Sequence, residues 1–278
     1  MKDLRGRVAV VTGAASGIGR ALARELARAG SRLALSDVND DGLAETRSLA
    51  EKEGAEVLAS HLDVADRAAV HRHADEVVAH YGAAHLVINN AGVALDAPID
   101  EMRYEDLEWL LGINFWGVVH GTKAFLPHLK RAGEGHIVNV SSVFGLIGVP
   151  GQSAYNAAKF AVRGFTECLR QELEIEGSGV SATCVHPGGI RTNIARSARL
   201  PGRSLSGLGR DDLVAAFDRA ARTSSERAAR DILDGVRRNA RRVLIGPDAW
   251  VIDRMNRWMP TGYQAVIAGL LRWRRGSA

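Results

Sequence analysis

The chain has 278 residues, of which 46% are hydrophobic, and it carries a formal net charge of +4. This length and composition predict a single globular domain with a well-buried core. The sequence opens without a charged and then apolar leader, and it has no apolar run near 18 residues, so we expect no signal peptide and no membrane span. A cytoplasmic location is the default expectation. The two cysteines lack metal-ligand spacing, which predicts no metal site.

The positive charge is concentrated at the C-terminal end of the chain. From Arg237 onward there are nine Arg and two Asp, a net of +7, which leaves −3 for everything before. This distribution argues against a nucleic-acid-binding surface over the body of the protein. It leaves the tail open to an anionic partner.

A glycine-rich turn joins the first predicted strand, Arg7–Val11, to a helical pattern. Glycines in this context permit a tight turn, close approach of backbone to a pyrophosphate, and close packing of helix on strand. The turn therefore predicts a dinucleotide site. Its candidate contacts are Gly13, Ser16, Gly17, Ile18 and Gly19.

The second predicted strand, Arg32–Asp37, ends in an acid 18 residues after Gly19. A carboxylate there can accept hydrogen bonds from both ribose hydroxyls and would repel a 2′-phosphate, which predicts NAD rather than NADP. Neither Ser16 nor Val38 supplies a cation for that phosphate. The alternative is that Asp37 caps the following helix.

Strand and helix patterns then alternate along the chain. Regular alternation predicts a doubly wound, mostly parallel Rossmann sheet of about seven strands between two layers of helices. We expect helices over residues 40–53, 66–81, 104–131, 155–176, 211–222 and 224–239, and later strands over 56–63, 85–89, 135–142, 180–185 and 242–246.

Ligand groups in such a sheet come from the carboxyl ends of the strands. Asp63 suits the adenine edge, and the Asn90–Gly92 stretch suits close backbone approach of the cofactor. The candidate cofactor residues at strand ends are Asp63, Val64, Asn90, Ala91, Gly92, Pro187 and Gly188.

Tyr155 and Lys159 should stand one turn apart on one helix face. A fixed ammonium favours phenolate, so the lysine is expected to lower the pKa of the tyrosine and make it a general base. Ser142, at the end of the preceding strand, can reach the same site and hold a substrate oxygen. Asn114 lies inside a long apolar helix, where an amide needs a partner or marks a local distortion.

Two further stretches bear on the substrate. Residues 190–222 are expected to contain a lid, because a Ser-, Gly- and Arg-rich segment carries spaced leucines. Phe144, Leu146 and Val149 follow the serine and are apolar, which predicts a lipophilic secondary alcohol or ketone.

Residues 248–278 form a basic, amphipathic helical extension that follows a catalytic domain at 1–247. One interpretation is a helix packed on its own subunit or a neighbour, closing the substrate cavity. The other is a segment in peripheral contact with an anionic membrane.

Taken together, these motifs resemble the short-chain dehydrogenase/reductase family over roughly residues 5–247, including the spacing of 13 residues from Ser142 to Tyr155. The resemblance implies an NAD(P)-dependent oxidoreductase acting on CH–OH groups, often a homotetramer, although a homodimer is also open. It implies a catalytic tetrad of Asn114, Ser142, Tyr155 and Lys159, in which Tyr155 and Lys159 also contact the cofactor, Ile190 and Thr192 lie beside the nicotinamide, and Asn114 maintains a water relay. The alternatives are an NADPH-dependent carbonyl reductase and a non-catalytic NAD-sensing scaffold.

Overall fold

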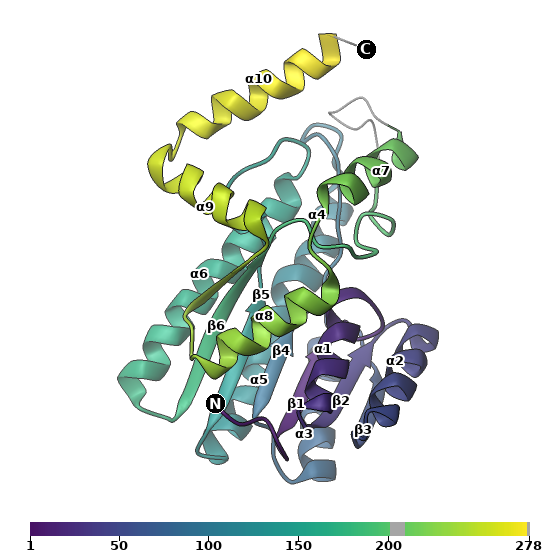
Figure 1. The fold of residues 1–278 in the computed structure, drawn as a ribbon, viewed down its shortest axis with the longest axis vertical. Coiled ribbons are helices and arrows are strands. Elements are labelled where there is room, and N and C mark those ends of the chain that lie inside the picture. Colours follow the sequence, from purple (N-terminus) through teal and green to yellow (C-terminus); the bar gives the residue numbers. More distant parts are fainter. Residues whose placement is uncertain (201–208, 277–278) are drawn as a thin grey trace.

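Seven parallel strands form one sheet in the order β3-β2-β1-β4-β5-β6-β7 (Figure 1). The structure, a computed structural model, describes residues 1–200 and 209–276. The strands are β1 Val8–Thr12, β2 Arg32–Asp37, β3 Val57–His61, β4 Leu86–Asn89, β5 Gly135–Val140, β6 Val180–Pro187 and β7 Arg242–Ile245. The order reverses between β1 and β4, which creates the crevice where ligands bind in doubly wound folds.

Helices cover both faces of this sheet, so the central strands are buried on both sides. The helices are α1 Gly17–Arg28, α2 Asp40–Lys52, α3 Arg67–Tyr81, α4 Tyr104–Leu111, α5 Gly117–Arg131, α6 Ser153–Glu176, α7 Arg210–Ala220, α8 Ser225–Arg237, α9 Pro247–Trp258 and α10 Gly262–Gly276. One hydrophobic core lies under α1, α2 and α8, and a second lies under α3, α5 and α6. The predicted doubly wound, single-domain fold is confirmed.

The helix expected near 104–131 contains an irregular turn. Between α4 and α5 the chain forms a π-helix, η1 Gly112–Trp116, with Asn114 fully buried in it. The alternatives for Asn114, a partner or a distortion, are both realised. Single π-turns within helices often mark functional sites.

The C-terminal extension forms α9 and α10, which lie at the same end of the molecule as α7 (Figure 1). Tyr263, at the start of α10, is buried, and its hydroxyl accepts a hydrogen bond of 2.9 Å from the backbone N–H of Gly148. The extension is therefore anchored to the loop that follows β5. Within residues 1–200 and 209–276, every helix is too short or too polar to cross a bilayer.

The expected lid is only partly described, because residues 201–208, including Leu205 and Leu208, lie outside the described residues. Its C-terminal part is α7, which has no buried residue. Leu213 and Phe217 of α7 face the large cavity described next.

Candidate active site

A cavity of about 710 Å³ opens at the carboxyl end of the sheet, a volume suited to a small-molecule ligand. Most of the residues predicted from sequence line its wall. These are Gly13, Ser16, Gly17, Ile18, Asp37, Asp63, Val64, Asn90, Ala91, Gly92, Ser142, Phe144, Val149, Tyr155, Lys159, Pro187, Gly188, Ile190 and Thr192.

The glycine-rich turn is held against the loop after β4. Thr12 Oγ1 accepts hydrogen bonds of 3.1 Å from the N–H groups of both Asn90 and Ala91, and the Asn90 amide donates to the Thr12 carbonyl at 2.9 Å. A Cβ on Gly13 would lie 2.7 Å from Ala91 Cα, so only glycine fits between the two loops. Gly19 does not line the cavity. It packs inside α1 against the Gly13 carbonyl, which makes it a packing residue for the turn.

The N-terminus of α1 is open toward the cavity. Ser16 is the N-cap residue, yet its side chain makes no capping hydrogen bond, and Ser16, Gly17 and Ile18 all line the cavity wall. Free backbone N–H groups and the positive end of the helix dipole favour an anion at such a terminus. The turn therefore fits the pyrophosphate of a dinucleotide.

Asp37 is held at the end of β2 by backbone donors. Its Oδ2 accepts from Ala15 N at 2.9 Å and its Oδ1 from Asn39 N at 3.0 Å. The alternative in which Asp37 caps α2 is wrong, because Asn39 is the N-cap and its side chain accepts from Gly42 N. The Asp37 carboxylate is thus fixed at the cavity wall, and its remaining lone pairs can accept further donors.

Ser142, Tyr155 and Lys159 meet on one wall of the cavity. Lys159 is 3% exposed, donates a 2.9 Å hydrogen bond from Nζ to the Val140 carbonyl, and lies 5.6 Å from the centroid of the Tyr155 ring. The two residues occupy successive turns of α6, as the spacing predicts. Ser142 Oγ accepts from Phe144 N at 3.1 Å, which leaves its own proton free to donate.

The expected lowering of the tyrosine pKa is wrong for the protein without a cofactor. Burial raises the pKa of Tyr155 to about 12, and a hydrogen bond from the Ser142 side chain opposes this rise only in part. Burial also lowers the pKa of Lys159 to about 8. Desolvation favours the neutral form of each group, so the phenol of the free protein is protonated at neutral pH.

Asn114 lies next to this group but does not line the cavity. Its Oδ1 accepts from Val93 N and its Nδ2 donates to the Val93 carbonyl, both at 2.8 Å. A Cβ on Gly92 would stand 3.3 Å from Asn114 Oδ1 and 3.6 Å from Lys159 Nζ. The side chain therefore ties the π-helix to the loop after β4 beside the lysine, whereas its role in a water relay stays a prediction.

The loop after β5 is fastened to α6 by Asn156. The Asn156 amide donates to the carbonyls of Phe144 and Ile147, and its Oδ1 accepts from Val149 N. This arrangement turns Phe144 and Val149 toward the cavity. Leu146, predicted to contact substrate, is instead 2% exposed and absent from the cavity wall, because the loop folds it inward.

The sequence reasoning missed many residues on the cavity wall, among them polar side chains with a clear structural role. Asp96 and Gln152 hydrogen-bond to each other across the wall at 2.8 Å. Asp248 and Ile252 come from α9, and Asp248 Oδ2 accepts from Gly189 N at 2.6 Å. The position of Gln152 one turn before Tyr155 was a usable signal, whereas nothing in the sequence indicated where α9 would dock.

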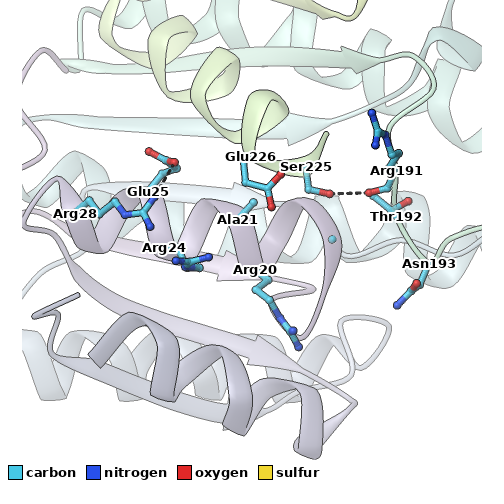
Figure 2. Close-up of a pocket in the computed structure, with 11 residues that line it drawn as sticks. Arg20, Ala21, Arg24, Glu25, Arg28, Arg191, Thr192, Asn193, Ser225 and Glu226 are labelled. Carbon is cyan, nitrogen blue, oxygen red and sulfur yellow. Dashed lines mark hydrogen bonds and ion pairs between the residues drawn. The ribbon is translucent and has the colours of Figure 1, made fainter. Parts of the chain in front are cut away.

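A second, smaller cavity of about 210 Å³ lies between α1 and α8 (Figure 2). Its arginines are already engaged: Arg20 donates to the Ala15 carbonyl, Arg24 to Glu53, and Arg28 to Glu25 and Glu53. At its edge the Ser225 hydroxyl donates to the Arg191 carbonyl at 2.8 Å, the dashed line in Figure 2. This cavity is therefore a gap between α1 and α8, and the Ser225 hydrogen bond at its edge holds the segment that carries Thr192.

Comparisons with known proteins agree with this architecture. A family model described as short chain dehydrogenase matches residues 7–201, so the chain belongs to the short-chain dehydrogenase/reductase family. It is 52% identical over 269 residues to a protein named SadH of Mycobacterium tuberculosis, covering 96% of each chain. It is 40% identical over 204 residues to a C alpha-dehydrogenase of a Sphingobium species, covering 72% of this chain and 66% of the relative.

A solved short-chain dehydrogenase/reductase from Burkholderia phymatum, in complex with NAD, superposes with a TM-score of 0.85 at 32% identity. The match covers 92% of this chain and 95% of that one. Family and neighbours together support an oxidoreductase with a nicotinamide cofactor site.

Proposed function

We propose that this protein oxidises a lipophilic secondary alcohol, or reduces the corresponding ketone, with NAD as cofactor and Tyr155 as the acid/base group. The observation that carries the proposal is the convergence of Ser142, Tyr155 and Lys159 on the wall of the same cavity that the glycine-rich turn and Asp37 line. A pure NAD-binding scaffold has no need of a buried phenol beside a buried ammonium.

The residues that would hold NAD span the cavity. Ser16, Gly17 and Ile18 would receive the pyrophosphate, Asp37 the adenosine ribose, and Asp63 and Val64 the adenine; Ile190 and Thr192 would contact the nicotinamide. When bound, NAD supplies the hydride acceptor. Two cationic side chains line the described part of the cavity, Lys159 and Arg210, and neither hydrogen-bonds to Asp37. A 2′-phosphate beside Asp37 would therefore meet a carboxylate without a cation, which supports NAD over NADP.

Four side chains of the site bind the substrate oxygen, transfer the proton and position these groups. The Ser142 hydroxyl donates to the substrate oxygen, and Tyr155 takes the alcohol proton in oxidation and returns it in reduction. Lys159 would stabilise the phenolate and hold the nicotinamide ribose. Asn114 keeps the π-helix and the Gly92 loop in position beside the lysine.

Apolar side chains support the lipophilic substrate. Phe144, Val149, Leu213, Phe217 and Ile252 line the same cavity as the serine and tyrosine, and the Phe144 ring lies 6.1 Å from the Tyr155 ring. Each apolar side chain that a ligand covers contributes favourably by removing its surface from water.

The test measures NADH formation from a panel of hydrophobic secondary alcohols, comparing wild type with Tyr155→Phe. We expect the variant to bind NAD normally and to lose about 10²- to 10⁴-fold in turnover, the contribution of general acid–base catalysis. Tyr104→Phe, at a tyrosine 81% exposed on α4, is the matched control and should be unchanged. NAD binding by a wild type that turns over no alcohol and no ketone would favour the NAD-sensing scaffold instead.

A further inference from the structure

The substrate side of the large cavity has one polar feature that the proposed reaction does not use. Apolar side chains dominate this wall, among them Val93, Leu95, Val143, Pro150 and Ile194. Asp96 and Gln152 face the cavity within this surface, joined by the 2.8 Å hydrogen bond from Gln152 Nε2 to Asp96 Oδ2.

The backbone fixes this pair from three directions. Asp96 N donates to the Arg199 carbonyl at 3.1 Å, and the next residue, Ala97, donates to the Gly151 carbonyl at 2.9 Å. Gln152 N donates to the Val149 carbonyl at 3.1 Å at the start of α6. The carboxylate is therefore part of a built wall rather than a side chain at the tip of a loop.

The carboxylate of Asp96 has no cationic partner among the side chains of residues 1–200 and 209–272. Its Oδ1 is shielded from solvent and meets no hydrogen-bond donor, so a donor that a substrate brings has to reach Oδ2, beside Gln152 Nε2. Three other charged side chains of the cavity wall are occupied: Lys159 donates to the Val140 carbonyl, Arg210 donates to the carbonyls of Arg196 and Ala198, and Asp248 accepts from Gly189 N. A carboxylate offers about four lone-pair sites, and a desolvated one gains from each donor it acquires.

The pair also lies close to the reacting oxygen. Gln152 is the N-cap residue of α6 and precedes Tyr155 by three residues, so the two side chains start about one helical turn apart. A group that reaches Asp96 would be a few bonds from the carbon that Tyr155 and Ser142 serve.

We propose that Asp96 and Gln152 form a subsite for a second, hydrogen-bond-donating group of the substrate. The inference rests on the proposed function and narrows its substrate class. The preferred substrate is an apolar secondary alcohol that carries a hydroxyl or an ammonium group near the reacting carbon. The uncompensated carboxylate disfavours alcohols that carry a carboxylate of their own.

The test uses four kinds of alcohol on one skeleton: 1-phenylethanol and its hydroxymethyl, aminomethyl and carboxylate ring derivatives. Each derivative is tested as its meta and para isomers, which makes seven compounds. We expect kcat/KM for the hydroxymethyl or the aminomethyl compound to exceed that of 1-phenylethanol about tenfold or more, as for a hydrogen bond to a charged group. The carboxylate should be the poorest substrate. The derivative with the higher kcat/KM shows whether the subsite prefers a hydroxyl or an ammonium group.

Asp96→Asn should abolish this preference, measured as the ratio of kcat/KM for the donor-bearing alcohol to kcat/KM for 1-phenylethanol, since a site built around a donor discriminates against its absence. Asp100→Asn, at an exposed acid on the same segment, is the control and should keep the preference. Unchanged melting and NAD binding verify that Asp96→Asn is folded. If this variant does not fold, the wild-type ranking alone decides.

Equal kcat/KM for 1-phenylethanol and both donor-bearing alcohols in the wild type would overturn the subsite. So would an equal loss on all four kinds of alcohol in Asp96→Asn. Titration of these alcohols into the wild-type NAD complex by calorimetry gives the same ranking as dissociation constants, independently of turnover. If oxidation depends on Tyr155 but kcat/KM is the same for all the alcohols, the proposed function stands and this inference alone is rejected.

Discussion

The ammonium of Lys159 lies 5.6 Å from the ring centroid of Tyr155 while it donates a hydrogen bond to the Val140 carbonyl. The lysine thus has a backbone partner of its own. Burial disfavours the charged form of each side chain, so it raises the pKa of Tyr155 to about 12 and lowers the pKa of Lys159 to about 8. The pair is not a pre-formed base in the free protein. We infer that the positive charge of oxidised NAD completes the activation by stabilising the phenolate.

The first prediction concerns this proton. The free enzyme holds the phenolic proton up to pH about 12, and bound NAD lowers the pKa, so NAD binding releases a proton between the lowered value and 12. NAD affinity should therefore rise with pH across that window, because binding and deprotonation favour each other. The neutral ring of NADH should show a much smaller rise.

Absorbance at 295 nm, as the difference between wild type and Tyr155→Phe, isolates this tyrosine from the other three. Titration with NAD present should show its phenolate at lower pH than titration without. Identical curves with and without NAD would contradict the coupling.

Local motifs made the part of the cavity wall around the glycine-rich turn predictable from sequence. The glycines near Gly13, the acid at Asp37 and the strand-end residues Asn90–Gly92 act through backbone geometry that follows directly from strand–turn–helix order. The parallel sheet was predictable for the same reason, since regular alternation permits few topologies.

The features that sequence could not supply all depend on tertiary packing. The pKa of Tyr155 is decided by burial, and the π-helix at Asn114 by its pairing with Val93, 21 residues away. Asp96 and Gln152 are 56 residues apart, and Asp248 acts only because α9 docks beside Gly189.

The second prediction concerns cofactor choice. Asp37→Asn removes the negative charge and keeps one oxygen, which can accept from one of the two backbone donors, Ala15 N or Asn39 N; unchanged melting verifies that the turn is folded. Losing the repulsion of a 2′-phosphate should raise kcat/KM with NADP about tenfold or more relative to NAD. Asp41→Asn, an exposed acid in the first turn of α2, should leave the ratio unchanged. A ratio that is the same in both variants would show that Asp37 does not select the cofactor.

The third prediction concerns Asp248, which holds the turn after Pro187 through Gly189 N. Asp248→Ala leaves that N–H without its acceptor and loosens the segment that leads to Ile190 and Thr192. We expect NAD to bind about five- to tenfold more weakly, the cost of one lost charged hydrogen bond. Asp248→Asn, which keeps an acceptor, should be intermediate, and calorimetry measures all three constants. Wild-type affinity in Asp248→Ala would mean that α9 plays no part in cofactor binding.

The fourth prediction concerns the outer face of the C-terminal extension. Trp250 and Trp258 of α9 and Val266 and Leu270 of α10 are exposed, and residues 254–278 contain five Arg and no acid. Tryptophan and arginine beside apolar side chains suit an anionic bilayer surface, where each Arg contributes about 1 kcal/mol. We therefore expect the full chain to co-sediment with phosphatidylserine vesicles, less so in high salt, and not with purely phosphatidylcholine vesicles.

Two substitutions of large, exposed aromatic side chains distinguish this face from the rest of the surface. Trp258→Ser should reduce vesicle binding about tenfold, because it removes a large side chain that is 81% exposed. Tyr104→Ser, at a tyrosine with the same 81% exposure on α4, should not change it. Unchanged vesicle binding together with a smaller assembly in Trp258→Ser, measured by light scattering, would instead identify the face as a contact between copies of the chain. Because Tyr263 joins α10 to Gly148 in the loop carrying Phe144 and Val149, membrane contact at this face would lie next to the substrate side of the cavity.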